Sequence, residues 1–148
     1  MSSYSQRVNT GQQMTTDYDL SKIFVFENRY QNDGYVNNSN YNPITLLAGT
    51  LMGRVTSTNS LVPWRAGAVD GSQRPIGILA QDIINLPSGS NQRASICVAG
   101  DVAASQIIFF AGDTLETQDN GRRVKDSIQS DSVGIKLVYS QEMTGSDN

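Results

Sequence analysis

Short apolar runs, separated by glycine, asparagine and proline, make up most of the chain between residues 44 and 141. The runs at 45–56, 61–65, 75–84, 94–99 and 133–140 have the lengths and the β-branched content that are typical of strands. No segment keeps an apolar repeat of 3.6 residues over the length of an ordinary helix. The pattern therefore predicts an all-β body, a small barrel or sandwich over residues 44–141, followed by a polar C-terminal tail at 142–148.

Turn residues separate the predicted strands. Asp70-Gly71 and Asn120-Gly121 are dipeptides that supply the positive φ angles of tight turns, and the second is flanked by two short strand-like segments. Residues 57–60 form a further predicted turn. Pro63 places the strand at 61–65 near a sheet edge, because proline cannot donate a hydrogen bond to a neighbouring strand. Residues 106–110 fit either a strand or a short helical turn.

The first 43 residues have a different composition. Five of the six tyrosines lie here among many asparagines, and the only strongly apolar cluster is Ile23-Phe24-Val25-Phe26. A segment with so little to bury cannot offset the entropy that it loses on ordering. We therefore predict an extended N-terminal arm over residues 1–43, which orders when residues 22–30 add a strand to the edge of a partner's sheet. A disordered tail is the alternative.

Amphipathic rings and the apolar cluster are the candidate contact residues of this arm, because flat side chains lose little entropy when they settle on a partner. The predicted contact residues are Tyr18, Ile23, Phe24, Val25, Phe26, Tyr30 and Tyr35. Trp64, the only tryptophan, is interpreted either as a core anchor or as a subunit-interface residue, and the core is favoured.

Charge and hydropathy argue against two classes of partner. The net charge of -3 and the pI near 4.7 disfavour nucleic acid, which requires a basic face, and they also disfavour an anionic membrane surface. No run is long and apolar enough to span a bilayer, and the N-terminus lacks the apolar core of a signal peptide. We expect a soluble protein that is made in the cytoplasm without secretion.

Candidate chemistry is sparse. The chain has no histidine and a single cysteine, Cys97, which excludes an internal disulfide and the usual general base. Cys97 lies in an apolar run and is predicted to be buried. The carboxylates are scattered without a recognisable catalytic pair, and no glycine-rich phosphate loop precedes a helix. We expect no enzymatic activity, no cofactor and no metal site.

An ordered set of motifs between residues 48 and 82 resembles the phage head decoration proteins of the lambda gpD-like family. The motifs are Gly49-Thr50-Leu51-Met52-Gly53, Leu61-Val62-Pro63-Trp64, Asp70-Gly71 and Gly77-Ile78-Leu79. The apolar run at 94–102 is similar to the next strand of that family. Two features depart from it: the N-terminal region is longer, and the chain ends in a predicted hairpin and strand where many members have a short helix.

The resemblance implies a small β-barrel or β-tulip-like sandwich in a structural virion protein. It implies homotrimers at threefold positions on the outer surface of a capsid, with each N-terminal arm paired to the major capsid protein. No nucleic acid, membrane or cofactor is expected. Two alternatives remain: a head-fibre base or tail-associated adhesin whose tyrosines and asparagines bind host glycans, and a lipoyl-like carrier domain modified at Lys125.

Overall fold

The computed structural model of the protein describes residue 20 and residues 22–39 and 41–139. Its elements are β1 (Phe24–Asn37), β2 (Ile44–Leu46), β3 (Leu51–Arg54), β4 (Leu61–Pro63), β5 (Pro75–Leu79), β6 (Ile83–Leu86), β7 (Asn91–Ala103), a 3₁₀ turn (Ala104–Gln106), β8 (Gln118–Asp119), β9 (Arg122–Arg123), α2 (Val124–Asp131) and β10 (Gly134–Val138). The predictions for Tyr18 and for the tail at 142–148 lie outside the described residues.

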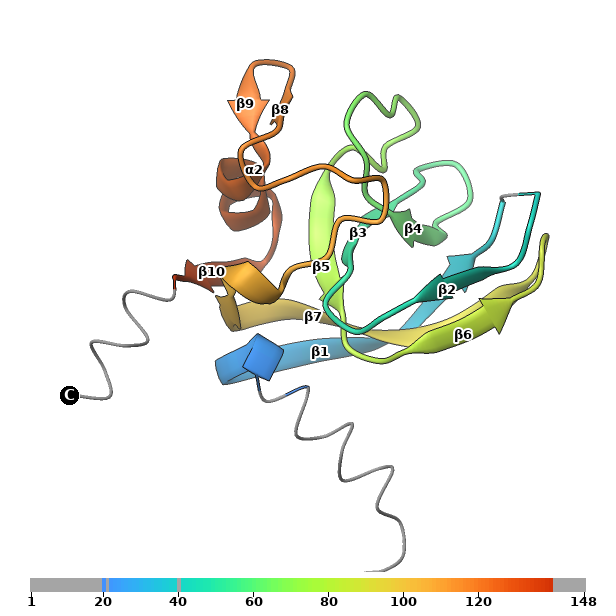
Figure 1. Ribbon diagram of the computed structural model, residues 1–148, viewed down its shortest axis with the longest axis horizontal. Helices are drawn as coiled ribbons and strands as arrows, with labels where there is room; N and C mark the ends of the chain where they lie inside the picture. The colour runs from blue at the N-terminus through green and yellow to red at the C-terminus, as the bar shows by residue number, and fades with distance from the viewer. Residues whose placement is uncertain (1–19, 21, 40, 140–148) are drawn as a thin grey trace, which may run out of the picture.

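Five strands close into a barrel in the order β1-β4-β3-β5-β7, with β7 paired back onto β1. Strand β10 extends the sheet on the far side of β7, and the short strands β2 and β6 form a separate two-stranded wing (Figure 1). The prediction of an all-β barrel is confirmed. None of the helices in the described part of the chain is long and apolar enough to cross a membrane.

Strand β7 pairs with three other strands, β1, β5 and β10. Its pairing with β1 is antiparallel and runs from Phe24↔Val102 to Asn37↔Asn91, so that the two long strands lie side by side along their whole length (Figure 1). The other edge of β7 pairs with β5 near Cys97 and, further along, in parallel with β10. Three separate parts of the chain therefore depend on one strand.

Both faces of the central strands are buried. Leu51 on β3, Ile78 on β5 and Cys97 on β7 pack into one core, which α2, β10 and Trp64 complete. Their immediate neighbours Met52, Leu79 and Ile96 point the other way into a second core beneath β2 and β6. Because successive side chains of a strand face opposite sides, burial on both faces requires continuous apolar runs, which explains the sequence pattern at 75–84 and 94–99.

The structure corrects the prediction for residues 22–30. Phe24–Asn37 is a strand of the protein's own barrel and pairs with β7 of the same chain, not with the edge of a partner's sheet. Val36 is fully buried in one core, and Ile23 and Phe24 are buried in the other. The apolar cluster therefore offsets the cost of ordering through contacts with distant residues, which the local composition did not indicate.

An eight-residue helix, α2, was not predicted. It buries only Val124 and Ile128, four residues apart, and two apolar positions give too short a repeat to be recognised as helical. The guanidinium of Arg122 lies beside its open face and donates to Ser127 Oγ and Ser130 Oγ, at 3.1 and 2.8 Å. The hairpin and the final strand that the sequence predicted are also present, as β8–β9 before this helix and β10 after it.

Two further segments differ in detail. The expected strand at 75–84 is divided into β5 and β6, because the Asp82 carboxylate accepts the Ala48 N–H at 2.8 Å and holds a bend between them. The Asn120-Gly121 hairpin is confirmed, with φ angles of 55° and 77° at its two central residues. Its strands are two residues long: the Val124 N–H still donates to Thr117 O at 2.9 Å, but α2 begins at Val124, whose side chain packs into the core.

Asn38 fixes the point at which β1 ends, and we predict that its replacement is costly. The buried amide donates to Asn42 O and Leu86 O at 2.9 and 2.8 Å. Asn38→Ala should lower the free energy of unfolding by about 1–3 kcal/mol, because the carbonyl groups of Asn42 and Leu86 would lose their hydrogen-bond donor. The neighbouring Asn37 makes an exposed bond to Asn91, so Asn37→Ala should change the stability by less than about 0.5 kcal/mol. Urea titrations of both variants measure the difference, and equal losses would contradict the assignment.

Candidate functional site

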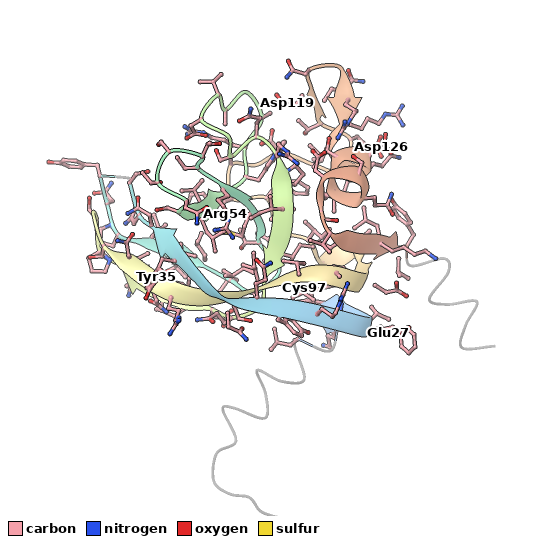
Figure 2. The ribbon with its side chains drawn as sticks, turned by 180° about the vertical axis from the view of Figure 1, so that it is seen from behind. Glu27, Tyr35, Arg54, Cys97, Asp119 and Asp126 are labelled. Carbon is pink, nitrogen blue, oxygen red and sulfur yellow. The ribbon has the colours of Figure 1, made fainter. Side chains whose placement is uncertain are left out.

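Four apolar or aromatic side chains of β1 are exposed to solvent: Val25, Phe26, Tyr30 and Tyr35, which are 40, 60, 44 and 50% exposed. We call them the exposed β1 set. Ile23 and Phe24, also predicted as contact residues, face the core and are unavailable to a partner in this structure. The exposed set follows nearly the whole strand, and the labelled residues Glu27 and Tyr35 lie toward its two ends (Figure 2).

Neighbouring side chains hold two of these rings in place. Tyr30 packs edge-on against the buried ring of Phe24, with centroids 5.7 Å apart. The Arg93 guanidinium on β7 lies 5.9 Å from the centre of the Tyr35 ring, which is within range for a cation–π contact. Burial raises the pKa of the Tyr30 hydroxyl, with a smaller contribution from Cys97, so that this group is a neutral donor at physiological pH. A partner would thus meet rings that are already oriented.

The backbone of β1 offers a second means of contact. One edge of the strand is paired with β7, whereas the other edge meets β4 only at Val36↔Leu61. Within the described residues, the outer edge from Phe24 to Tyr35 has no strand partner. Such an edge presents a row of N–H and C=O groups that can accept another extended segment.

The strand at the other edge of the sheet, β10, is protected against strand addition. Along the outer side of β10, the Ile135 N–H donates to Ser132 Oγ at 3.0 Å and the Leu137 N–H donates to Gln129 Oε1 at 3.1 Å. Both acceptors belong to α2 or to the residue that follows it. Because these donors are already satisfied, β10 is a poor edge for strand addition, and β1 is left as the open one.

A bulge near the start of β1 sets the direction of the first exposed residues. Glu27 has a φ of 49°, and the pairing register with β7 shifts between Phe26 and Arg29. The Asn28 amide donates to Asp101 O at 2.9 Å and fastens the bulge to β7. Gly100 lies opposite with a φ of 109°, and a Cβ there would be 2.6 Å from Asn28 Cα. The bulge therefore requires glycine at position 100.

Trp64 and Cys97 are both interior residues. Trp64 is 1% exposed, packs edge-on against Phe109, and donates from Nε1 to Gln73 O at 2.7 Å, as expected for the core interpretation. Burial raises the pKa of the Cys97 thiol, which hydrogen-bonds Ala99 O at 3.2 Å. A protonated buried thiol is a weak nucleophile, so Cys97 has a packing role.

Lys125 does not have the geometry of a carrier lysine. Its ammonium lies 2.9 Å from Glu116 Oε2, and its side chain is only 26% exposed. Arg122 and Arg123 likewise pair with carboxylates, those of Asp131 and Glu116. Among the described residues, no three cysteine, histidine, aspartate or glutamate side chains gather in a way that could hold a metal ion.

Residues 27–126 match the family model of the bacteriophage lambda head decoration protein D, which is about two thirds of the chain. The match and the β-barrel with its exposed strand β1 together define the class of protein, which is a phage head structural protein. The chain belongs to the bacteriophage lambda head decoration protein D family. A search of curated proteins found no match to it. The matched region begins within β1 and ends within α2, so the family's domain includes most of the strand that the sequence had suggested was an arm.

Replacement of Gly100 tests the bulge that positions Phe26. Gly100→Ala should lower the free energy of unfolding by about 2–5 kcal/mol, because the new Cβ is both strained and in contact with the β1 backbone. Gly112→Ala is the matched control: its φ is also positive, at 86°, but a Cβ there meets nothing within 4 Å. The control should lose only about 1–2 kcal/mol. Thermal and urea unfolding measure both, and similar losses would contradict the close approach.

Proposed function

We propose that this protein decorates and stabilises the outer surface of a phage capsid, as trimers at threefold positions. The N-terminal region contacts the major capsid protein, through Tyr18 and through the exposed β1 set. The proposal rests on one observation. Strand β1 of this decoration-family barrel carries both oriented, exposed rings and a backbone edge that, in the described residues from Phe24 to Tyr35, has no strand partner. Extended segments add to such edges through main-chain hydrogen bonds and are selected by side chains.

This chain meets the physical requirements of a protein that stabilises a capsid by decorating it. Stabilising a shell needs buried area that bridges neighbouring subunits, without any chemical step. Three copies in a trimer attach together, so that contacts which are weak singly become strong by effective concentration. The acidic composition, with a net charge of -3, disfavours binding to the packaged nucleic acid. On this proposal the protein is made in the cytoplasm of the host bacterium and ends on the virion surface, where it acts without enzymatic activity.

The structure also defines how an arm deletion must be designed. Removing all 43 residues of the predicted arm would delete β1, which closes the barrel and contributes Val36 to its core. Loss of capsid binding in that variant would report unfolding. A deletion of residues 1–19 leaves every described strand intact and separates the contribution of the leader from that of β1.

The direct test adds the full-length protein to expanded phage heads that lack their decoration protein and examines them by cryo-electron microscopy. We expect density at the threefold positions, with β1 against the major capsid protein. The 1–19 deletion should bind at least about tenfold more weakly while keeping its unfolding free energy. If the deletion decorates heads as tightly as the full chain, the contribution of Tyr18 and its neighbours is excluded.

Substitution of exposed residues on β1 gives a further prediction. The double variant Val25→Ser, Phe26→Ser should reduce the affinity for heads by about tenfold or more, because buried aromatic contacts dominate protein interfaces. Phe110→Ser is the matched control, since Phe110 is 44% exposed and lies outside β1. Pelleting of heads with labelled protein measures both affinities. An unchanged affinity of the double variant, or an equal loss in the control, would place the interface elsewhere.

A further inference from the structure

A groove with a volume of about 410 Å³ opens where β1 and β4 diverge. The two strands meet only at Val36↔Leu61. Beyond this pair β1 turns away, because the Asn38 N–H and C=O bond to Ser90 and Gly89 on another loop. The groove lies at the Asn37 end of β1, whereas Val25 and Phe26 lie at its other end. Its volume is within the range of small-molecule sites, about 300–1,000 Å³.

One wall of the groove is a rigid turn that presents a carboxylate. Asp70 Oδ1 accepts hydrogen bonds from the Ser72 N–H and hydroxyl, at 3.0 and 2.5 Å. The turn is held against the barrel, since the Thr56 N–H donates to Asp70 O at 2.9 Å and Gly71 leaves no room for a side chain beside Thr56. Within the described part of the chain, Asp70 Oδ2 receives no hydrogen bond from another residue. It is a preformed acceptor.

Donor groups and an apolar surface complete the groove. Arg65 is exposed, makes no ion pair closer than 4 Å with any described residue, and lies near enough to Asp70 to help lower the pKa of that carboxyl, after the larger effect of Ser72. Phe110 lines the groove and is 44% exposed. Its neighbour Phe109 is fixed edge-on to Trp64, which also lines the groove. Asn37 contributes an amide side chain.

Two ligand classes fit this groove poorly. Residue 62 of β4 and residue 64, which follows the strand, direct their backbone groups to β3, so residues 61, 63 and 65 direct theirs toward β1 and the groove. Pro63 has no N–H, so the outward edge lacks a donor that an added peptide strand would need. An anion would meet Arg65 but also the Asp70 carboxylate, and the two charges oppose each other.

We propose that this groove binds a neutral carbohydrate. Asp70 Oδ2 accepts and Arg65 donates hydrogen bonds to ring hydroxyls, and Phe110 contacts the apolar face of the sugar ring. A polyhydroxylated ring offers donors and acceptors on its rim and C–H groups on its faces, which matches this set of groups. On the proposed decorated capsid, the site would give the virion a contact to host-surface glycans. The binding itself is independent of the capsid.

The test titrates the isolated full-length protein with methyl glycosides of the common neutral hexoses and N-acetylhexosamines. Trp64 lines the groove and is the only tryptophan, so its fluorescence reports occupancy without labelling. We expect a saturable response at millimolar concentrations for at least one glycoside. Amide chemical-shift changes should be confined to the groove, around residues 37–39, 58–65, 70–72 and 110–111.

Variants assign the site. Asp70→Asn keeps an oxygen for Ser72 but replaces the free acceptor with a donor, and Arg65→Gln removes the guanidinium. Each should weaken binding about tenfold or more while leaving the amide spectrum of the fold unchanged. Asp126→Asn on α2, none of whose residues line the groove, is the matched control and should bind normally.

Three results would overturn the proposal: no saturable response to any glycoside, binding that Asp70→Asn and Arg65→Gln leave unchanged, or shifts in the groove with a synthetic peptide of residues 1–19 and none with glycosides. Because the experiment contains no phage heads, its failure leaves the proposed capsid function untouched.

Discussion

The antiparallel pairing of β1 with β7 is the interaction on which the rest of the structure depends. Strand β7 carries β1 along one edge and β5 and β10 along the other, so it connects the barrel to the α2–β10 unit. Strand β1 in turn closes the barrel through its single pair with β4 and places Phe24 in one core and Val36 in the other. Without this pairing, both cores would be open to water and the barrel would lose two of its five contacts between strands.

The same pairing leaves β1 half exposed, and this exposed half is the contact surface that we propose. One face and one edge of β1 are used internally, and the outer edge and the exposed β1 set remain for a partner. Protein sheets usually protect their edges, as Gln129 of α2 and Ser132 just after it do here by accepting the outward N–H groups of β10. An unprotected edge that carries oriented rings is the kind of surface that a decoration protein requires, because its affinity must come from contacts alone.

Local features of the fold could be predicted from the sequence, whereas long-range ones could not. Asn120-Gly121 predicted its hairpin, because few other residues tolerate two consecutive positive φ angles. The ordered motifs from Gly49 to Leu79 indicated the family that the comparison then identified. The pairing of β1 with β7 was not predicted, because β7 lies far away in the sequence. The tyrosines and asparagines of β1 suggested a polar arm instead.

The candidate sites show the same limit. Val25, Phe26, Tyr30 and Tyr35 were selected from composition and are exposed, but Ile23 and Phe24 in the same apolar cluster are buried. Only the direction in which each side chain faces in the folded barrel distinguishes the two groups. The groove at Asp70 had no signal in the sequence, since its lining residues come from β1, β2, β4 and four separate loops. Helix α2 has an apolar face of two residues, too short a pattern to recognise.

Hydrogen–deuterium exchange, measured on the free protein and on decorated heads, tests the central claim most directly. If β1 is an integral strand with an open outer edge, amides of residues 24–37 that face β7 exchange slowly in the free protein, and those that face outward exchange fast. Binding to heads should then slow the outward set. Uniformly fast exchange across residues 24–37 in the free protein would contradict the account, because the segment would then be an arm that orders only on its partner.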